Sequence, residues 1–270
     1  MQTNLSSGVL VDSALLPPTN PISVELGGTE LTPEDSKSYT LGAVYTLGDV
    51  FITLDYYNIE VEDRISQSEK INLTDQNKAT LIAAGVPNVA GLAQVSFFTN
   101  DFDTTTSGID LVANYATELM GGNSTFSLAY NWNETKVDRF SDITGDFKVK
   151  RLEEDLPNHR ATATWAQSMD EFSFFTRVNY YGEYQGVHVD YDATAITADA
   201  AVTVDVEFSY FLTEEFTLTA GAQNVFDQDA ERINIPNNVA PNNNWGGVFY
   251  ETSPFGINGG FYYVQATYSF

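Results

Sequence analysis

The 270-residue chain contains no cysteine. This excludes disulfide bonds, thiolate metal sites and a cysteine nucleophile, and it is compatible with an oxidising cell envelope. Basic residues are scarce: 12 lysines and arginines stand against 37 aspartates and glutamates, which gives a formal net charge of −25. Because phosphate binding requires clustered lysine and arginine, we expect no nucleic acid among the partners.

Long apolar runs are also missing. Mean hydropathy is −0.20, and no uncharged stretch approaches the about 20 apolar residues that a transmembrane helix needs. A transmembrane β-barrel is not excluded, because its strands are about 10 residues long and half polar. The aromatic content of 13% is high enough to supply rings at both membrane interfaces.

The amino terminus lacks an export signal. Residues 1–13 have no basic start, no apolar core and no small-residue cleavage site, so they do not form a signal peptide. We therefore expect either a soluble chain or part of a longer one.

The carboxyl terminus is more informative. In the last eleven residues, GFYYVQATYSF, apolar side chains alternate with polar ones. Successive side chains of a strand point to opposite faces, so the segment predicts a strand with one apolar and one polar face. Tyr268 and the terminal Phe270 fall on the apolar face. An aromatic final residue is typical of the proteins that the barrel-assembly machinery of Gram-negative bacteria inserts, so we interpret these two residues as a barrel-assembly terminus.

Eight further strands are predicted as four pairs joined by tight turns. The pairs are residues 38–47 with 50–62, 106–119 with 125–137, 160–167 with 172–183, and 201–212 with 216–226. Longer connections separate them, at about residues 63–105, 138–159, 184–200 and 227–259. Outer-membrane barrels have short periplasmic turns and long extracellular loops, which places the tight turns and the terminus in the periplasm.

One helix is expected within the first long connection. Residues 74–85 have helical spacing and end on a glycine.

Three segments carry a resemblance to a known family. They are ELTPEDSKSYTLG (30–42), LDYYNIEVEDRI (54–65) and NVFDQDAERI (224–233). Together with the aromatic terminus they resemble the carboxyl-terminal third of TonB-dependent outer-membrane receptors, over about residues 28–270. The departures are Thr32, Thr40 and Val225, which stand where lysine, glutamate and leucine are usual.

The resemblance implies a 22-stranded barrel with an amino-terminal plug, which imports a scarce nutrient such as an iron-siderophore, cobalamin or an oligosaccharide. About nine strands would lie in this chain as an open, antiparallel part of the all-β barrel wall. Residues 1–37 would be an extracellular loop segment and residues 38–270 the carboxyl-terminal part of the barrel. The implied partners are outer-membrane lipid and lipopolysaccharide, the barrel-assembly machinery, TonB through the missing plug region, and an unknown small ligand.

No catalytic, cofactor or metal site is predicted, and we expect no enzyme. The two histidines, His159 and His188, are not in a zinc-binding spacing. The acidic loops are most simply solvated, although two groups could bind a divalent cation: Asp101 with Asp103, and Asp227 with Asp229 and Glu231. Amides and aromatic rings in the last long loop suit sugars or metal chelates, which makes four residues candidate ligand contacts: Asn243, Trp245, Phe249 and Tyr250.

Two alternatives remain open. One is a small porin-like or adhesin-like outer-membrane barrel, and the other is a soluble acidic β-sandwich that binds or cleaves carbohydrate. The small barrel predicts a signal peptide and an even number of strands, and the sequence shows neither. The alternation of short and long connections and the terminal Phe270 count against the β-sandwich.

Overall fold

The computed structural model describes residues 2–6, 9–187, 195–232, 249 and 253–270. Contacts between residues divide the chain into two compact units. Unit 1 comprises residues 1–38, 59–106 and 135–152, and unit 2 comprises residues 39–58, 107–134 and 153–270. Within the described ranges no helix is long and apolar enough to cross a membrane.

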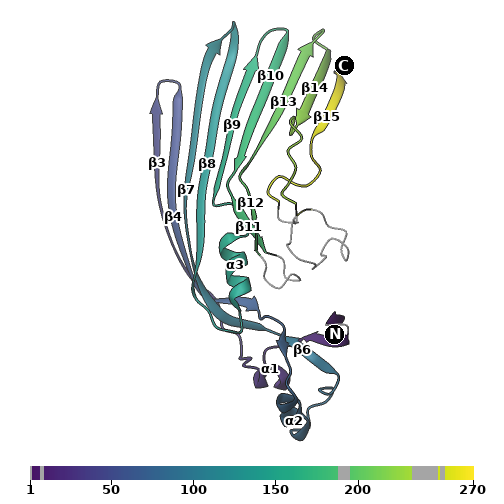
Figure 1. Ribbon diagram of the computed structural model, residues 1–270. Helices are drawn as coiled ribbons and strands as arrows, with labels where there is room; N and C mark the ends of the chain where they lie inside the picture. Colours follow the sequence, from purple (N-terminus) through teal and green to yellow (C-terminus); the bar gives the residue numbers. More distant parts are fainter. Residues whose placement is uncertain (1, 7–8, 188–194, 233–248, 250–252) are drawn as a thin grey trace. The chain divides into compact units, whose positions relative to one another are not determined.

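Nine strands form one sheet with two open edges (Figure 1). Its order is β15-β14-β13-β10-β9-β8-β7-β4-β3, so β3 and β15 are the edge strands. The strands are β3 (Asp35–Leu47), β4 (Val50–Gln67), β7 (Phe98–Leu119), β8 (Gly122–Arg139), β9 (His159–Ser168), β10 (Phe172–Tyr181), β13 (Ala201–Phe211), β14 (Phe216–Gln223) and β15 (Phe261–Tyr268). The prediction of about nine strands in an open wall is confirmed.

The two faces of this sheet differ in chemistry. Directly opposed residues of neighbouring strands lie on the same face. One row across β8, β9, β10 and β13 is apolar and consists of Leu128, Ala163, Val178 and Val204. The row beside it is polar and consists of Ser127, Thr164, Arg177 and Asp205. We name the two sides, which the alternation predicted, the apolar face and the polar face.

The tight turns follow hairpin geometry. Gly48 has a φ of 57° at the first position of the turn between β3 and β4, as a type II′ turn requires. Met120 and Gly121, between β7 and β8, both have positive φ, of 54° and 78°, as in a type I′ turn.

Several predicted strand boundaries were wrong. The sequence predicts a turn that includes Gly122 and Asn123, but these two residues begin β8. A Cβ on Gly122 would collide with the carbonyl oxygen of Ser168, so this glycine allows close approach of β9 rather than a turn. β4 and β7 extend into the expected loop at 63–105. β14 ends at Gln223 rather than at residue 226, because Asn224 has a φ of 48° and leaves the extended conformation.

Two bridges on the polar face each span three strands. Tyr57 of β4 lies over Gly108 of β7, and its hydroxyl accepts a hydrogen bond from Asn133 Nδ2 of β8 at 3.0 Å. Tyr263 of β15 lies over Gly221 of β14 in the same way and donates to the carboxylate of Glu207 of β13. A Cβ on either glycine would collide with the tyrosine ring, so glycine is required at both positions.

Unit 1 contains a second sheet, whose strand order is β1-β2-β6-β5. These strands are β1 (Gln2–Ser6), β2 (Val9–Leu15), β5 (Ile71–Asn72) and β6 (Leu92–Ser96). β2 and β6 pair in parallel. With α1 (Pro21–Glu25) and α2 (Asp75–Ala83), they enclose a buried core that includes Ile22, Leu81, Val89, Val95 and Phe97. The expected loop at 63–105 is therefore largely ordered structure.

The predicted helix at 74–85 is confirmed as α2. Thr74 is its N-cap and forms a capping box with Asn77, in which each side chain satisfies a backbone N–H of the other residue. Sequence reasoning missed α3 (Asp146–Glu154) and a separate hairpin of β11 (Tyr184–Val187) and β12 (Ala195–Ala198). Residues 1–37 contain β1, β2 and α1, and their assignment to an extracellular segment stays a prediction.

Candidate functional site

An ion cluster joins three strands within unit 1. Arg139 of β8 binds both carboxylate oxygens of Asp103 of β7, through Nε at 2.7 Å and a terminal nitrogen at 2.8 Å. The same terminal nitrogen lies 2.9 Å from Asp63 Oδ1 of β4. Hydrogen bonds from Arg139 hold the pKa of Asp103 below its ordinary value, and Asp103 raises the pKa of Arg139 in return. The cluster fixes these strands through charge-assisted bonds.

The first two family-like segments contact each other. Glu34 Oε1 accepts a hydrogen bond from the backbone N–H of Ile65 at 2.6 Å. Lys37 Nζ lies 3.3 Å from Glu62 Oε1. Glu34 therefore aligns the first segment with the second.

Carboxylates of both acidic groups make contacts within the protein, and their binding of a cation stays a prediction. Asp103 is paired with Arg139, and Asp101 Oδ2 accepts the backbone N–H groups of Ser141 and Thr144 at 3.2 and 3.0 Å. In the part of the chain that the structure describes, no three His, Asp or Glu side chains are placed to hold a metal ion. Asp227, in the second group, accepts a hydrogen bond from the backbone N–H of Gly260.

The polar face carries a second cluster in unit 2. The guanidinium of Arg160 lies 5.2 Å from the ring centre of Tyr181, which is itself 5.3 Å from the ring of Phe255. Tyr184 follows in the chain and is only 6% exposed. Burial raises the pKa of its phenol, while a hydrogen bond with Ser253 acts in the opposite direction. The exposed guanidinium of Arg160, beside the half-buried rings of Tyr181 and Phe255, can bind planar or anionic groups by stacking and charge.

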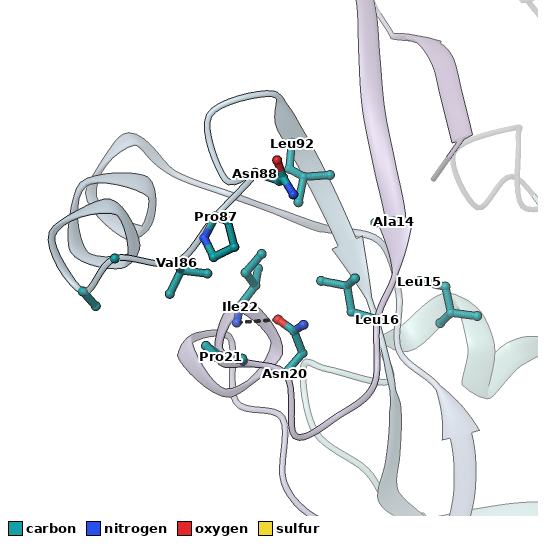
Figure 2. A pocket seen from close by; sticks show the side chains of 12 residues that line it. Ala14, Leu15, Leu16, Asn20, Pro21, Ile22, Val86, Pro87, Asn88 and Leu92 are labelled. Atoms are coloured by element: carbon teal, nitrogen blue, oxygen red, sulfur yellow. Dashed lines mark hydrogen bonds between the residues drawn. The ribbon is translucent and has the colours of Figure 1, made fainter.

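An apolar pocket of about 560 Å³ opens in unit 1 (Figure 2). Its walls are mainly aliphatic and include Leu16, Ile22, Val86 and Leu92. The amide oxygen of Asn20 at its rim accepts a hydrogen bond from the backbone N–H of Ile22 at 2.9 Å, which caps α1. The pocket therefore offers hydrophobic contact and little polar recognition.

The four predicted ligand contacts are only partly within the described residues. Asn243, Trp245 and Tyr250 lie outside them. Phe249 lies under the guanidinium of Arg232, 5.5 Å from the ring centre, and pairs with the same residue as a β-bridge. Its role in ligand binding stays a prediction.

The histidines are likewise separated. His188 lies outside the described residues. His159 begins β9, and its Nδ1 is 2.8 Å from the hydroxyl of Tyr130.

Comparison with known proteins identifies the family. The family model described as "TonB dependent receptor-like, beta-barrel" matches residues 3–225. The chain belongs to the TonB-dependent receptors. It is similar to the vitamin B12 transporter BtuB of Vibrio vulnificus, with 27% identity over 203 residues, which are 75% of this chain and 27% of BtuB. The family consists of receptors and transporters of the outer membrane, where this chain is accordingly located.

Solved structures share the fold. The FrpB iron transporter of Neisseria meningitidis (F5-1 variant) has a TM-score of 0.59 and 13% identity, and the match covers 88% of this chain and 32% of that one. The ferripyoverdine receptor of Pseudomonas aeruginosa has a TM-score of 0.55 and 15% identity, with 89% and 28% covered. The chain spans about a third or less of these relatives. At such identities the structures show the fold alone.

Sequence reasoning missed the Arg139 cluster and the Arg160 cluster. Asp63, Asp103 and Arg139 are far apart in the chain and meet only through strand pairing, so spacing gave no signal for them. The Arg160 cluster had a weak signal. Arg160 and Tyr181 fall on the polar side of two strands that the alternation did predict, and their register makes them opposed.

Proposed function

We propose that this chain is the carboxyl-terminal part of the barrel of a receptor that imports a scarce nutrient with energy supplied through TonB. The family match supports the proposal most strongly. The nine-stranded sheet adds physical support, because an apolar face suits lipid and a polar face suits a hydrated interior. A β-sandwich would instead bury one face against a second sheet.

The nutrient class and the partners are part of the same proposal. Vitamin B12 and iron complexes are what the relatives' names specify for those proteins, and an oligosaccharide would suit the same architecture. Lipid and lipopolysaccharide would contact the apolar face, the barrel-assembly machinery would recognise Tyr268 and Phe270, and TonB would bind a plug outside this chain. We propose no enzymatic activity.

Uptake in cells tests the proposal. The receptor encoded by the complete locus is produced in a Gram-negative host, and uptake of radiolabelled cyanocobalamin, ferric siderophores and labelled oligosaccharides is measured with and without functional TonB. We expect saturable uptake of one class that falls to background without TonB. Non-saturable uptake that persists without TonB would indicate a porin and contradict the proposal.

The last long loop supplies candidate ligand contacts, which we propose from its composition. Trp245→Ala and Tyr250→Ala should weaken uptake of the transported class, because aromatic rings contribute stacking area. Phe51→Ala is the control, since Phe51 is an exposed aromatic residue beside the tight turn between β3 and β4, outside the last long loop. Unchanged uptake in both loop variants would remove these contacts from the proposal.

A further inference from the structure

Residues 224–227 connect β14 to the long segment that returns as β15. They include the start of the third family-like segment, whose role the proposed function leaves unexplained. We propose that these residues, with Asp205 and Gly259 and Gly260, form a clasp that fixes both ends of this segment at one point of the sheet. The clasp would position the segment whatever nutrient the receptor imports.

The outgoing end is held on β13. The backbone N–H of Asn224 donates to Asp205 Oδ1 at 2.9 Å, and the N–H of Val225 donates to the carbonyl of Val204 at 2.8 Å. The side chain of Asn224 then binds Gln228 twice. Its Oδ1 accepts from the backbone N–H and its Nδ2 donates to the carbonyl, both at 2.9 Å. The turn is therefore bonded on both sides.

The returning end is held by the same turn. Asp227 Oδ1 accepts the backbone N–H of Gly260 at 2.7 Å, just before β15 begins. The hydroxyl of Tyr262 donates to the carbonyl of Val225 at 2.9 Å. The chain thus leaves the sheet and rejoins it within a single hydrogen-bonded group.

Backbone conformation explains the residue types. Asn224 and Asp227 have φ values of 48° and 55°, in the left-handed region that asparagine and aspartate tolerate best after glycine. Gly259 has a φ of 66°, and a Cβ there would collide with Asp227 Oδ1. A Cβ on Gly260 would lie 2.8 Å from the carbonyl oxygen of Asn224. Both glycines give the carboxylate and the turn room to approach.

Asp205 also joins the clasp to the polar face. While its Oδ1 accepts from Asn224, its Oδ2 lies 3.4 Å from Asn179 Nδ2 and 3.8 Å from Arg177. Asn179 in turn donates to Thr203 Oγ1 at 3.2 Å. One carboxylate therefore positions the turn relative to the polar side chains of β10 and β13.

Hydrogen exchange in the full receptor, embedded in phospholipid vesicles, tests the clasp. Asp227→Ala should speed amide exchange at Asn224 and Gln228, as well as at Gly260, by about tenfold, since one lost hydrogen bond loosens the whole group. Residues 172–181 of β10 should be unchanged. Asp227→Asn keeps an acceptor oxygen and should restore slow exchange at all three sites.

A glycine pair provides the matched control. Gly259→Ala should act like Asp227→Ala, whereas Gly256→Ala should leave exchange at Asn224 and Gln228 unchanged. Gly256 also has a positive φ, of 80°, but no atom lies within 4 Å of an added Cβ. Faster exchange confined to Gly260 in Asp227→Ala, or equal effects of the two glycine variants, would show separate hydrogen bonds and overturn the clasp.

Discussion

The two units place the same kinds of apolar side chain in opposite surroundings. In unit 1, Val95 and Phe97 are 0% exposed and belong to a conventional core. In unit 2, Val264 of β15 is 74% exposed, and Tyr262 and Leu128 also lie open on the apolar face. Burial in the protein explains the apolar residues of unit 1, whereas those of unit 2 require an apolar solvent outside the protein.

Polar side chains also differ between the two units. In unit 1, Arg139 and Asp103 form their ion pair on a half-exposed surface. In unit 2, polar side chains hydrogen-bond from strand to strand, as Asn131 does with Asp110 at 2.7 Å. In unit 1, apolar side chains are therefore buried and charged side chains lie at the surface. In unit 2, the polar and apolar side chains are instead separated onto the two faces of one sheet.

The largest expected effect comes from a substitution in the buried core of unit 1. Phe97→Ala should lower the stability of unit 1 by about 3–5 kcal/mol, because it deletes a fully buried ring. Phe98→Ala is the adjacent control, since that ring is 41% exposed. Protection of residues 71–96 against amide exchange measures the loss. Equal losses in the two variants would contradict a water-excluding core.

A charge on the apolar face should have the next largest effect. Leu128→Arg should lower unfolding free energy in phospholipid vesicles by about 2–4 kcal/mol, the cost of arginine near the middle of a bilayer. Ala129→Arg places the same charge on the polar face and should cost much less. Denaturant unfolding from vesicles compares them. If both variants lost the same stability, the two faces would not meet lipid and water.

The carboxyl terminus separates stability from insertion. Phe270 is fully exposed, so Phe270→Ala should lower stability by no more than about 2 kcal/mol, the value for burying such a ring in lipid. The abundance of this variant in the outer membrane should fall far more than that loss of stability explains, because we expect the ring to be recognised during insertion. Ser269→Ala leaves the apolar face intact and should change neither. Wild-type abundance of the Phe270 variant, by quantitative immunoblot, would make this residue only a strand end.

The smallest expected effect concerns the ion cluster and carries a pH signature. The folded-state pKa of Asp103 is depressed, so its stabilisation of unit 1 is complete above the ordinary pKa near 3.8 and is lost as pH falls through the folded value. Arg139→Met should cost about 1 kcal/mol at neutral pH and reduce that acid dependence. Exchange protection of residues 98–105, corrected for the intrinsic pH effect, measures both.

A peripheral ion pair is the control for that experiment. Lys37→Met breaks the ion pair with Glu62, whose two side chains are both more exposed than Asp103. It should leave the acid dependence of unit 1 as in the wild type. An unaltered acid dependence in Arg139→Met would show that the cluster does not stabilise the fold through charge.

The strands of unit 2 could be predicted because their signal is local. Alternation along a segment such as Phe261–Tyr268 fixes both faces without knowledge of the neighbouring strand. Unit 1 could not be predicted in the same way. β5 has two residues, and β2 pairs in parallel with β6, about 80 residues further on. Such elements depend on tertiary contacts rather than on a repeating pattern.

The candidate sites could be predicted only in part, for the same reason. The predicted strand at 216–226 includes Asn224, but side-chain hydrogen bonds to Gln228 stabilise a left-handed turn at this residue instead. The ion cluster required the register of three strands. Composition indicated that the last loop is rich in amides and rings, and it could not indicate that Phe249 contacts Arg232.

The tyrosine bridges of the polar face also act as a check on strand alignment during folding. A slip of one residue turns every side chain of a strand to the other face. After such a slip in β15, Tyr263 would no longer lie over Gly221 and could not reach Glu207. The bond from Asn133 to Tyr57 likewise forms only when β4, β7 and β8 are all aligned. Each bridge therefore depends on the alignment of two strands that are not adjacent in the sheet. Backbone hydrogen bonds join only adjacent strands and cannot report that alignment.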